Sequence, residues 1–223
     1  IGSLMGSTRN LILLDTETSG LNEGPEACEI VQIYAKALNY YDFSDHHAGD
    51  FHAIIKPRRP EKAQAGAIKV LGPLWDRANK EGLEPEIVWK EFAKWCNSVN
   101  PEGKYTTAPL FVAYNKDFDS KFVRSAMLEY RIVKHGKFGP EFPWGFEMDA
   151  MMLSYSLLES DPNINDFKLN TVLNYFGLVR ADAHIHDAKE DVELMTQLVR
   201  RMMLFMRAAK KKMKVQTPVP TAL

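Results

Sequence analysis

The stretch LILLDTETSG, residues 11–20, begins with four apolar residues and then reaches two acids, Asp15 and Glu17. An unbroken apolar run is typical of a strand that is covered on both faces of a sheet. Side chains at i and i+2 of a strand point to the same face, so the two acids project together from its carboxyl end. Adjacent carboxylates repel unless a proton or a cation lies between them. Alone, the pair fits either a divalent-cation site or a solvated turn.

Length and composition set broad limits on the kind of protein. The 223 residues suffice for one α/β domain, and 45% hydrophobic with 26% charged residues is ordinary for a globular chain. The net charge of −1 lacks the overall basic signature of a nucleic-acid binder, although a local patch or bound metal ions remain compatible with it. Cys28 and Cys96 lie far apart, so we expect no disulfide framework and a reducing, cytoplasmic location. No segment approaches the length of a membrane span, so no membrane partner is expected.

The order of the expected elements indicates an α/β domain with a mixed sheet. The expected strands are residues 10–15, 29–41, 50–57 and 108–114, and the second and third pair as an antiparallel hairpin. The expected helices are residues 85–99, 117–130, 148–160, 169–177 and 187–212. Residues 63–82 are read as irregular or weakly helical. We find neither an internal repeat nor a linker between domains.

Two further acids, Asp117 and Asp119, open the helix that follows the fourth strand. Helical spacing places Asp117 beside Lys121 and Arg124, on a face that is typical of solvated ion pairs. The same spacing places Asp119 beside Phe122, on an apolar face. A carboxylate is costly to bury unless it is paired or bound to a metal ion, so we expect Asp119 to point inward to such a partner. The alternative is an acid that only favours the helix dipole.

The stretch HIHDAKED, residues 184–191, contains the last candidates. Asp187 opens a capping-box pattern, which predicts that it is the N-cap of the final helix. Asp191 lies one turn inside that helix and begins an apolar stripe. His184 and His186 precede the helix, and His186 is the nearer to its start. The alternative for either histidine is a partly exposed loop residue.

Four inward acids and one histidine together favour a metal-binding catalytic site over a purely structural role for these residues. If Asp15, Glu17, Asp119 and Asp191 converge, their mutual repulsion requires cations. Two divalent ions about 4 Å apart are the arrangement that phosphoryl-transfer enzymes use for in-line displacement. A histidine at the rim is suited to accept a proton because its ordinary pKa lies near neutrality.

Three motifs, in order, resemble those of the DnaQ-like, DEDDh-type 3′–5′ exonucleases. They are DTETSGL (15–21), AYNKDFDSKF (113–122) and HDAKED (186–191). The resemblance extends from about residue 10 to about residue 205. It implies an RNase H-like α/β fold, with a central mixed five-stranded sheet flanked by helices. The expected parts are the exonuclease domain at 9–207, a vector remnant or disordered start at 1–8, and a basic helix end with a disordered tail at 208–223.

The resemblance also implies a catalytic and metal-binding set. Asp15, Glu17, Asp119 and Asp191 would bind two Mg²⁺ or Mn²⁺ ions, and His186 would be the general base. The implied reaction is metal-dependent hydrolysis of single-stranded 3′ ends to nucleoside 5′-monophosphates. DNA is the first expectation and RNA trimming is the alternative. Less favoured alternatives are a non-catalytic module that binds nucleic acid or a polymerase, and a metal-dependent phosphatase.

Other positions correspond to substrate contacts or depart from the family pattern. Thr18, Leu21 and Asn115 match positions near the terminal nucleotide. Tyr114 stands where many members have a histidine. Asp149 resembles an acid at the start of the next helix, and we read it as a cap. Expected partners are a single-stranded DNA or RNA 3′ end and either a DNA polymerase or a second copy of the chain, in proofreading or repair.

The segment 58–83 leaves two readings open. It contains Arg58, Arg59 and Trp75, which would either contact a nucleic-acid backbone or only decorate the surface. The basic run RAAKKKMK, residues 207–214, is read first as a solvated helix end.

Overall fold

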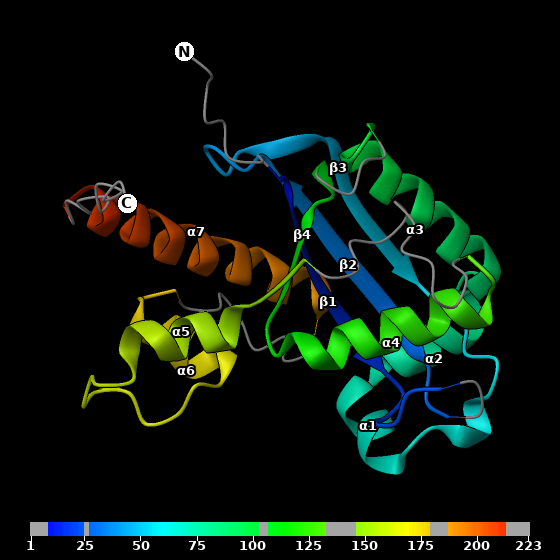
Figure 1. The fold of residues 1–223 in the computed structure, drawn as a ribbon. Coiled ribbons are helices and arrows are strands. Elements are labelled where there is room, and N and C mark those ends of the chain that lie inside the picture. Colours follow the sequence, from blue (N-terminus) through cyan, green and yellow to red (C-terminus); the bar gives the residue numbers. More distant parts are fainter. Residues whose placement is uncertain (1–8, 25–26, 103–106, 133–145, 179–186, 213–223) are drawn as a thin grey trace, which may run out of the picture.

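The computed structural model describes residues 9–24, 27–102, 107–132, 146–178 and 187–212. Within these residues one five-stranded mixed sheet is flanked by helices, which confirms the expected α/β fold (Figure 1). Cys28 and Cys96 are both free and buried. None of the helices that the structure describes is at once long and apolar enough to cross a bilayer.

The strands follow the order β3-β2-β1-β4-β5 across the sheet. They are β1 (Leu11–Thr18), β2 (Ile30–Leu38), β3 (Asp45–Ile54), β4 (Leu110–Ala113) and β5 (Glu147–Asp149). The predicted antiparallel hairpin of β2 and β3 is confirmed, and β1 pairs antiparallel with β2 and parallel with β4. Strand β1 is therefore central, and its carboxyl end lies beside the carboxyl end of β4.

Two strand predictions were wrong. Strand β3 begins at Asp45 instead of residue 50, because a polar sequence is tolerated on an edge strand with one solvated face. Strand β5 was not predicted at all, since Met148 and Asp149 were assigned to the start of the next helix and Glu147 to no element. A strand of three residues shows no periodicity that a sequence pattern can reveal.

The helices account for most of the remaining described residues. They are α1 (Ala65–Leu71), α2 (Pro73–Glu81), α3 (Pro85–Val99), α4 (Lys116–Glu129), α5 (Ala150–Leu158), α6 (Leu169–Tyr175) and α7 (Ala188–Lys212), with a short 3₁₀ turn at Pro60–Lys62. The segment 63–82, which was read as irregular or weakly helical, is thus largely helical, and the irregular alternative was wrong. Gly72, at φ 52°, separates α1 from α2, so neither helix exceeds nine residues.

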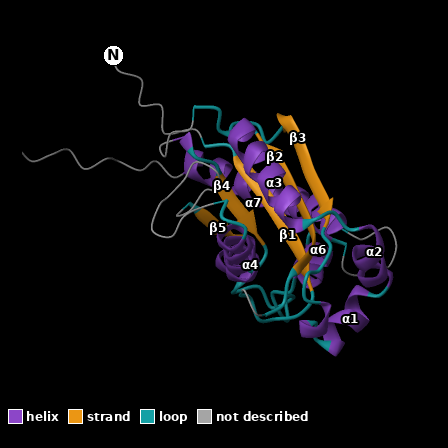
Figure 2. Cartoon of the chain, turned by 90° about the vertical axis from the view of Figure 1, so that its right-hand side faces the viewer, coloured by secondary structure: helices purple, strands orange, loops and turns teal. Residues whose placement is uncertain are grey.

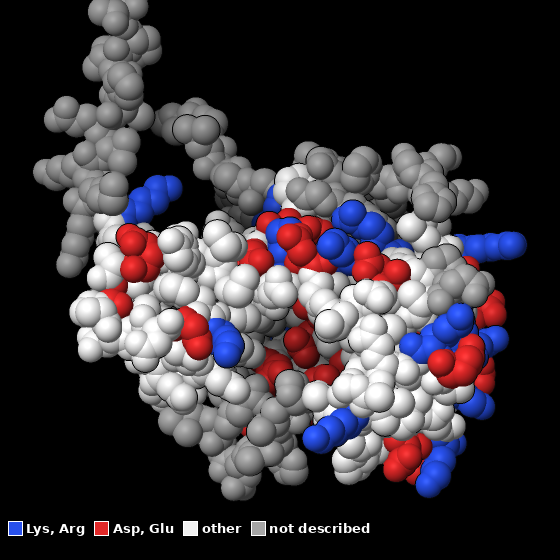
Figure 3. Space-filling model, turned by 90° about the horizontal axis from the view of Figure 1, so that it is seen from below, with Lys and Arg blue, Asp and Glu red and all other residues white. Residues whose placement is uncertain are grey.

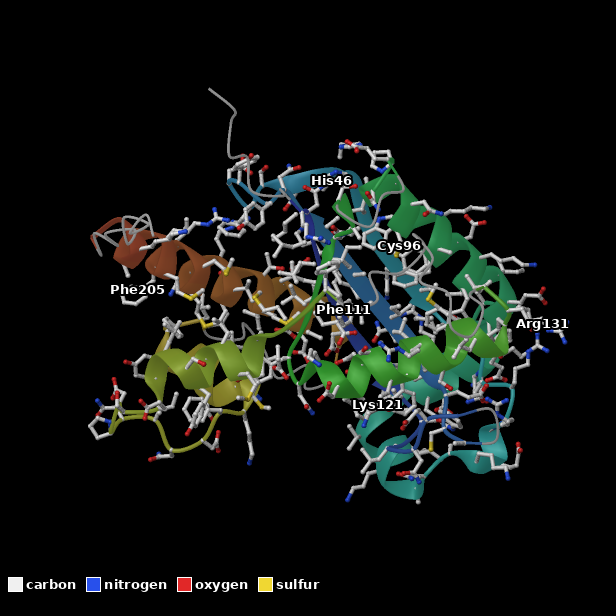
Figure 4. The ribbon with its side chains drawn as sticks, in the orientation of Figure 1. His46, Cys96, Phe111, Lys121, Arg131 and Phe205 are labelled. Carbon is white, nitrogen blue, oxygen red and sulfur yellow. The ribbon has the colours of Figure 1, made fainter. Side chains whose placement is uncertain are left out.

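The alternation of side chains along β1 divides the core into two layers. Ile12 and Leu14 join the cluster formed with α3 and α4. Leu11 and Leu13 join the cluster formed with α7. All four are fully buried, so β1 is covered on both faces, as its unbroken apolar run predicted (Figure 2). Phe111 of β4 lies in the same interior, whereas Phe205 of α7 is 65% exposed (Figure 4).

Candidate active site

The carboxyl end of β1 places acids on the α7 face of the sheet. Asp15 and Glu17 continue the side of the strand that carries the α7-facing leucines, and Asp191 approaches them from the first turn of α7. One carboxylate oxygen from each of the three residues lies within 4.8 Å of the other two. Glu17 is only 8% exposed, so this group is partly withdrawn from water.

The fourth predicted acid reaches the site from the opposite face. Asp119, on α4, is 2% exposed, and its Oδ1 accepts hydrogen bonds from the Thr16 N–H at 2.9 Å and the Thr16 hydroxyl at 2.7 Å. Burial raises the pKa of Asp119 to about 7. Asp117 is exposed and paired with Lys116, and Lys121 is exposed on the same helix (Figure 4). The structure therefore directs Asp119 inward and Asp117 outward, as the helical spacing predicted.

This donor set is suited to hard divalent cations. Three carboxylates that approach within 4.8 Å, with a fourth buried at the same cleft, repel one another in the absence of positive charge. Mg²⁺ and Mn²⁺ take carboxylate oxygens as ligands, so Asp15, Glu17, Asp119 and Asp191 fit such ions.

The start of α7 is held in two ways. Asp187 caps the helix, since its Oδ1 accepts from the backbone N–H groups of Lys189 at 2.9 Å and Glu190 at 3.2 Å. The predicted N-cap is thus confirmed. The N–H of Ala188 donates to Oε1 of Gln32 at 3.4 Å, and Gln32 pairs with Glu17 across β1 and β2. The turn that carries Asp191 is therefore tied to the strand beside Glu17.

Gln32 was missed in the sequence, although a signal was present. It is a polar residue within the buried run IVQIYA, and it is only 3% exposed. Its Nε2 lies 3.1 Å from Nε2 of the exposed His52 on β3. Both predicted candidates His184 and His186 lie outside the described residues.

A cleft of about 470 Å³ opens over these acids. Seen from below, acidic side chains gather in a hollow that is bordered mainly by uncharged residues (Figure 3). Thr18, Leu21 and Asn115, the predicted substrate contacts, all line this cleft. One wall comes from α1 and includes Gly66, Ala67, Val70 and Leu71, together with Gln64 just before it. The α1 wall was not predicted, because residues 63–82 were read only as irregular or weakly helical, with no defined helix.

The two turns beside the cleft are linked by Asp149. Asn115 has φ 62°, and its N–H donates to Oδ1 of Asp149 at 3.2 Å. The same oxygen accepts from the Met151 N–H at 2.8 Å at the start of α5, which confirms Asp149 as a cap. Tyr114, the departure from the family pattern, donates its hydroxyl to the Phe167 carbonyl at 2.5 Å.

The two arginines and the tryptophan of the 58–83 segment make structural contacts. The Arg59 guanidinium lies 2.5 Å from Glu129 and 3.4 Å from Glu29. Arg58 pairs with Glu84 at 3.0 Å. Trp75 packs with Val31, Leu71 and Ala78 in a small separate core. It is α1, and not these side chains, that this segment contributes to the cleft.

A mixed sheet with acids gathered at the end of its central strand is typical of metal-dependent nucleases of the RNase H-like class. The sequence comparison agrees, because the family model described as "Exonuclease" (RNase_T) matches residues 12–199. The chain belongs to this exonuclease family. The resemblance to DEDDh exonucleases is confirmed. A comparison with curated protein sequences finds no match.

Solved structures share this fold at low sequence identity. Cell-death related nuclease 4 (CRN-4) superposes with a TM-score of 0.68 at 15% identity, covering 89% of this chain and 65% of that one. E. coli exonuclease I in complex with a dT13 oligonucleotide gives 0.68 at 17% identity, covering 92% and 43%. The nuclease domain of 3′hExo, a DEDDh family member bound to rAMP, gives 0.65 at 16% identity, covering 92% and 95%. The chain thus spans about two thirds of CRN-4 and less than half of exonuclease I.

Proposed function

We propose that this protein is a 3′–5′ exonuclease that hydrolyses the terminal phosphodiester of single-stranded nucleic acid and releases nucleoside 5′-monophosphates. The observation that carries the proposal is the approach of Asp15, Glu17 and Asp191 within 4.8 Å, in the cleft that Asp119 also lines. Membership of the exonuclease family supports it. The domain that performs the reaction would be residues 9–207.

The four acids would hold two divalent ions. When bound, these ions supply charge neutralisation and activation of the attacking water. Thr16 holds one oxygen of Asp119 through two hydrogen bonds, and this orients the carboxylate in the cleft. Burial of Glu17 and Asp119 strengthens their interaction with any cation by lowering the local dielectric.

His186 is the proposed general base. It directly precedes Asp187, whose carboxylate caps α7, and it is five residues before Asp191. A neutral imidazole near the water could accept its proton at physiological pH. The protonated ring would then release that proton to solvent.

The residues that line the cleft are the argument for a single-stranded substrate. Thr18, Leu21 and Asn115 line its walls, and Leu21 is 72% exposed, so its side chain is available to contact a base. DNA is the first proposed substrate and RNA the second, in keeping with a dT13 complex of exonuclease I and an rAMP complex of 3′hExo. A polymerase or a second copy of this chain is the proposed protein partner, in proofreading or repair, and the proposed location is the cytoplasm.

The test uses the same single-stranded sequence as DNA and as RNA, labelled at either end. With Mg²⁺ or Mn²⁺, the 5′-labelled strand should give a descending ladder, whereas the 3′-labelled strand should release labelled mononucleotide at once. EDTA should stop both reactions. Release of a mononucleotide from the 5′ end, or no cleavage of either polymer with either metal, would contradict the proposal.

A further inference from the structure

The loop after β1 is bonded to the residue that begins α1. The backbone N–H of Gln64 donates to the Ser19 carbonyl at 2.8 Å. In return, the N–H of Leu21 donates to Oε1 of Gln64 at 3.2 Å. Within the loop, the Thr18 hydroxyl donates to the Gly20 carbonyl at 2.7 Å. Residues 18–21 and residue 64 therefore form one bonded unit, which we call the Gln64 clamp.

The Gln64 side chain also lies close to Gly20 of the loop. A Cβ placed on Gly20 would lie 2.7 Å from Cδ and 2.8 Å from Cγ of Gln64, and 2.4 Å from Sγ of Cys28. Real Cβ atoms essentially never approach so closely, so the Gln64 side chain occupies space that only a glycine leaves open. The Gln64 side chain therefore packs closely over Gly20.

The clamp joins two walls of the cleft. Leu21 lies on the loop, and Val70 lies on α1, six residues after Gln64. Both line the cleft, and both are large apolar side chains with high exposure, 72% for Leu21 and 50% for Val70. Their separation depends on how α1 is held against the loop, and α1 has only seven residues of its own. Gln64 holds that end of α1.

We propose that Gln64 is a positioning residue that sets how tightly the cleft binds the terminal nucleotide. This inference rests on the proposed exonuclease function and adds a residue outside its three motifs. Gln64 is not part of the acidic group formed by Asp15, Glu17 and Asp191. Loss of its carboxamide should therefore weaken substrate binding while leaving metal binding and the chemical step intact.

The first test is kinetic and uses Gln64→Met, which keeps the length of the side chain but removes the acceptor. We expect KM for a single-stranded oligonucleotide to rise about tenfold and kcat to stay within about twofold of the wild type. This pattern is expected when the lost interaction stabilises the bound substrate and the transition state equally. The Mn²⁺ concentration for half-maximal activity should not change. The matched control is Gln197→Met, the same substitution at an exposed position of α7, which should leave KM unchanged.

The second test does not depend on activity. Amide hydrogen exchange of the peptide that contains residues 18–21 should be faster in Gln64→Met than in the wild type, and unaltered in Gln197→Met. Unchanged exchange in this peptide, or a fall in kcat at constant KM, would overturn the assignment. If the wild type cleaves no substrate, the proposed function fails and the binding role falls with it. The exchange result would still decide whether the clamp exists.

Discussion

Replacement of Asp119 by asparagine should stabilise the metal-free protein at alkaline pH. Burial is the main cause that raises the pKa of this carboxyl from 3.8 to about 7, and the charge of Asp149 adds to it. The folded state therefore binds a proton that the unfolded state has lost between these two values. Stability falls as pH rises through that interval and is level above it. Asparagine avoids this loss and still offers Oδ1 to the two Thr16 donors.

The magnitude follows from the shift of the pKa. Each pKa unit corresponds to about 1.4 kcal/mol, so a shift of roughly three units corresponds to about 4 kcal/mol at pH 8. Near pH 4 the protonated acid and the amide should be nearly equal in stability. The assay is urea unfolding in EDTA at pH 4.5, 6 and 8, with the free energy of unfolding extrapolated to water.

Asp117, on the same helix as Asp119, provides the control substitution. Asp117 is exposed, and its hydrogen bond to Lys116 lowers its pKa, so Asp117→Asn should bring no gain of stability at pH 8. Adding Mn²⁺ should reverse the order and favour the wild type, because only the carboxylate binds the cation strongly. Equal stability of Asp119→Asn and wild type in EDTA at every pH would refute the reasoning about burial.

Two other substitutions test the Arg59 ion pairs outside the cleft and the hydrogen bond between Gln32 and the start of α7. Arg59→Met should destabilise the protein by about 3–5 kcal/mol in urea unfolding, because it leaves the largely buried Glu29 and Glu129 without their cation. A loss below about 1 kcal/mol would show that water solvates both carboxylates once the guanidinium is removed, and would contradict the prediction. Gln32→Met should lower kcat several-fold and reduce the free energy of unfolding by about 1–3 kcal/mol, since the buried Ala188 N–H loses its acceptor at the start of α7. Steady-state kinetics check this effect, and an unchanged kcat would remove Gln32 from the support of the site.

The parts of the site that were predictable follow from local periodicity. Strand parity placed Asp15 and Glu17 on one face, and helical spacing separated Asp119 from Asp117. The two caps, Asp149 and Asp187, depend on hydrogen bonds to residues two or three positions away. Such features involve neighbours in the chain, so the sequence pattern contains them.

The parts that were not predictable depend on contacts between distant segments. Thr16 and Asp119 are 103 positions apart, and Gln32 and Ala188 are 156 positions apart. The packing of helices against the sheet decides which polar side chain bonds to which distant backbone group. The periodicity of the sequence describes only neighbouring residues, so it does not predict these pairs. The α1 wall was missed for a related reason: seven residues that pack mainly through one short face show too few turns for an amphipathic pattern.

The central claim is that the acids gathered at the end of β1 form a divalent-metal site that hydrolyses 3′ ends. The most direct measurement compares wild type, Asp191→Asn and Asp117→Asn on 5′-labelled single-stranded DNA and RNA with Mn²⁺. Asp191→Asn should reduce cleavage of the favoured polymer by at least about a thousandfold while remaining folded, and Asp117→Asn should stay close to wild type. Wild-type activity that persists in Asp191→Asn, or in excess EDTA, would contradict the account.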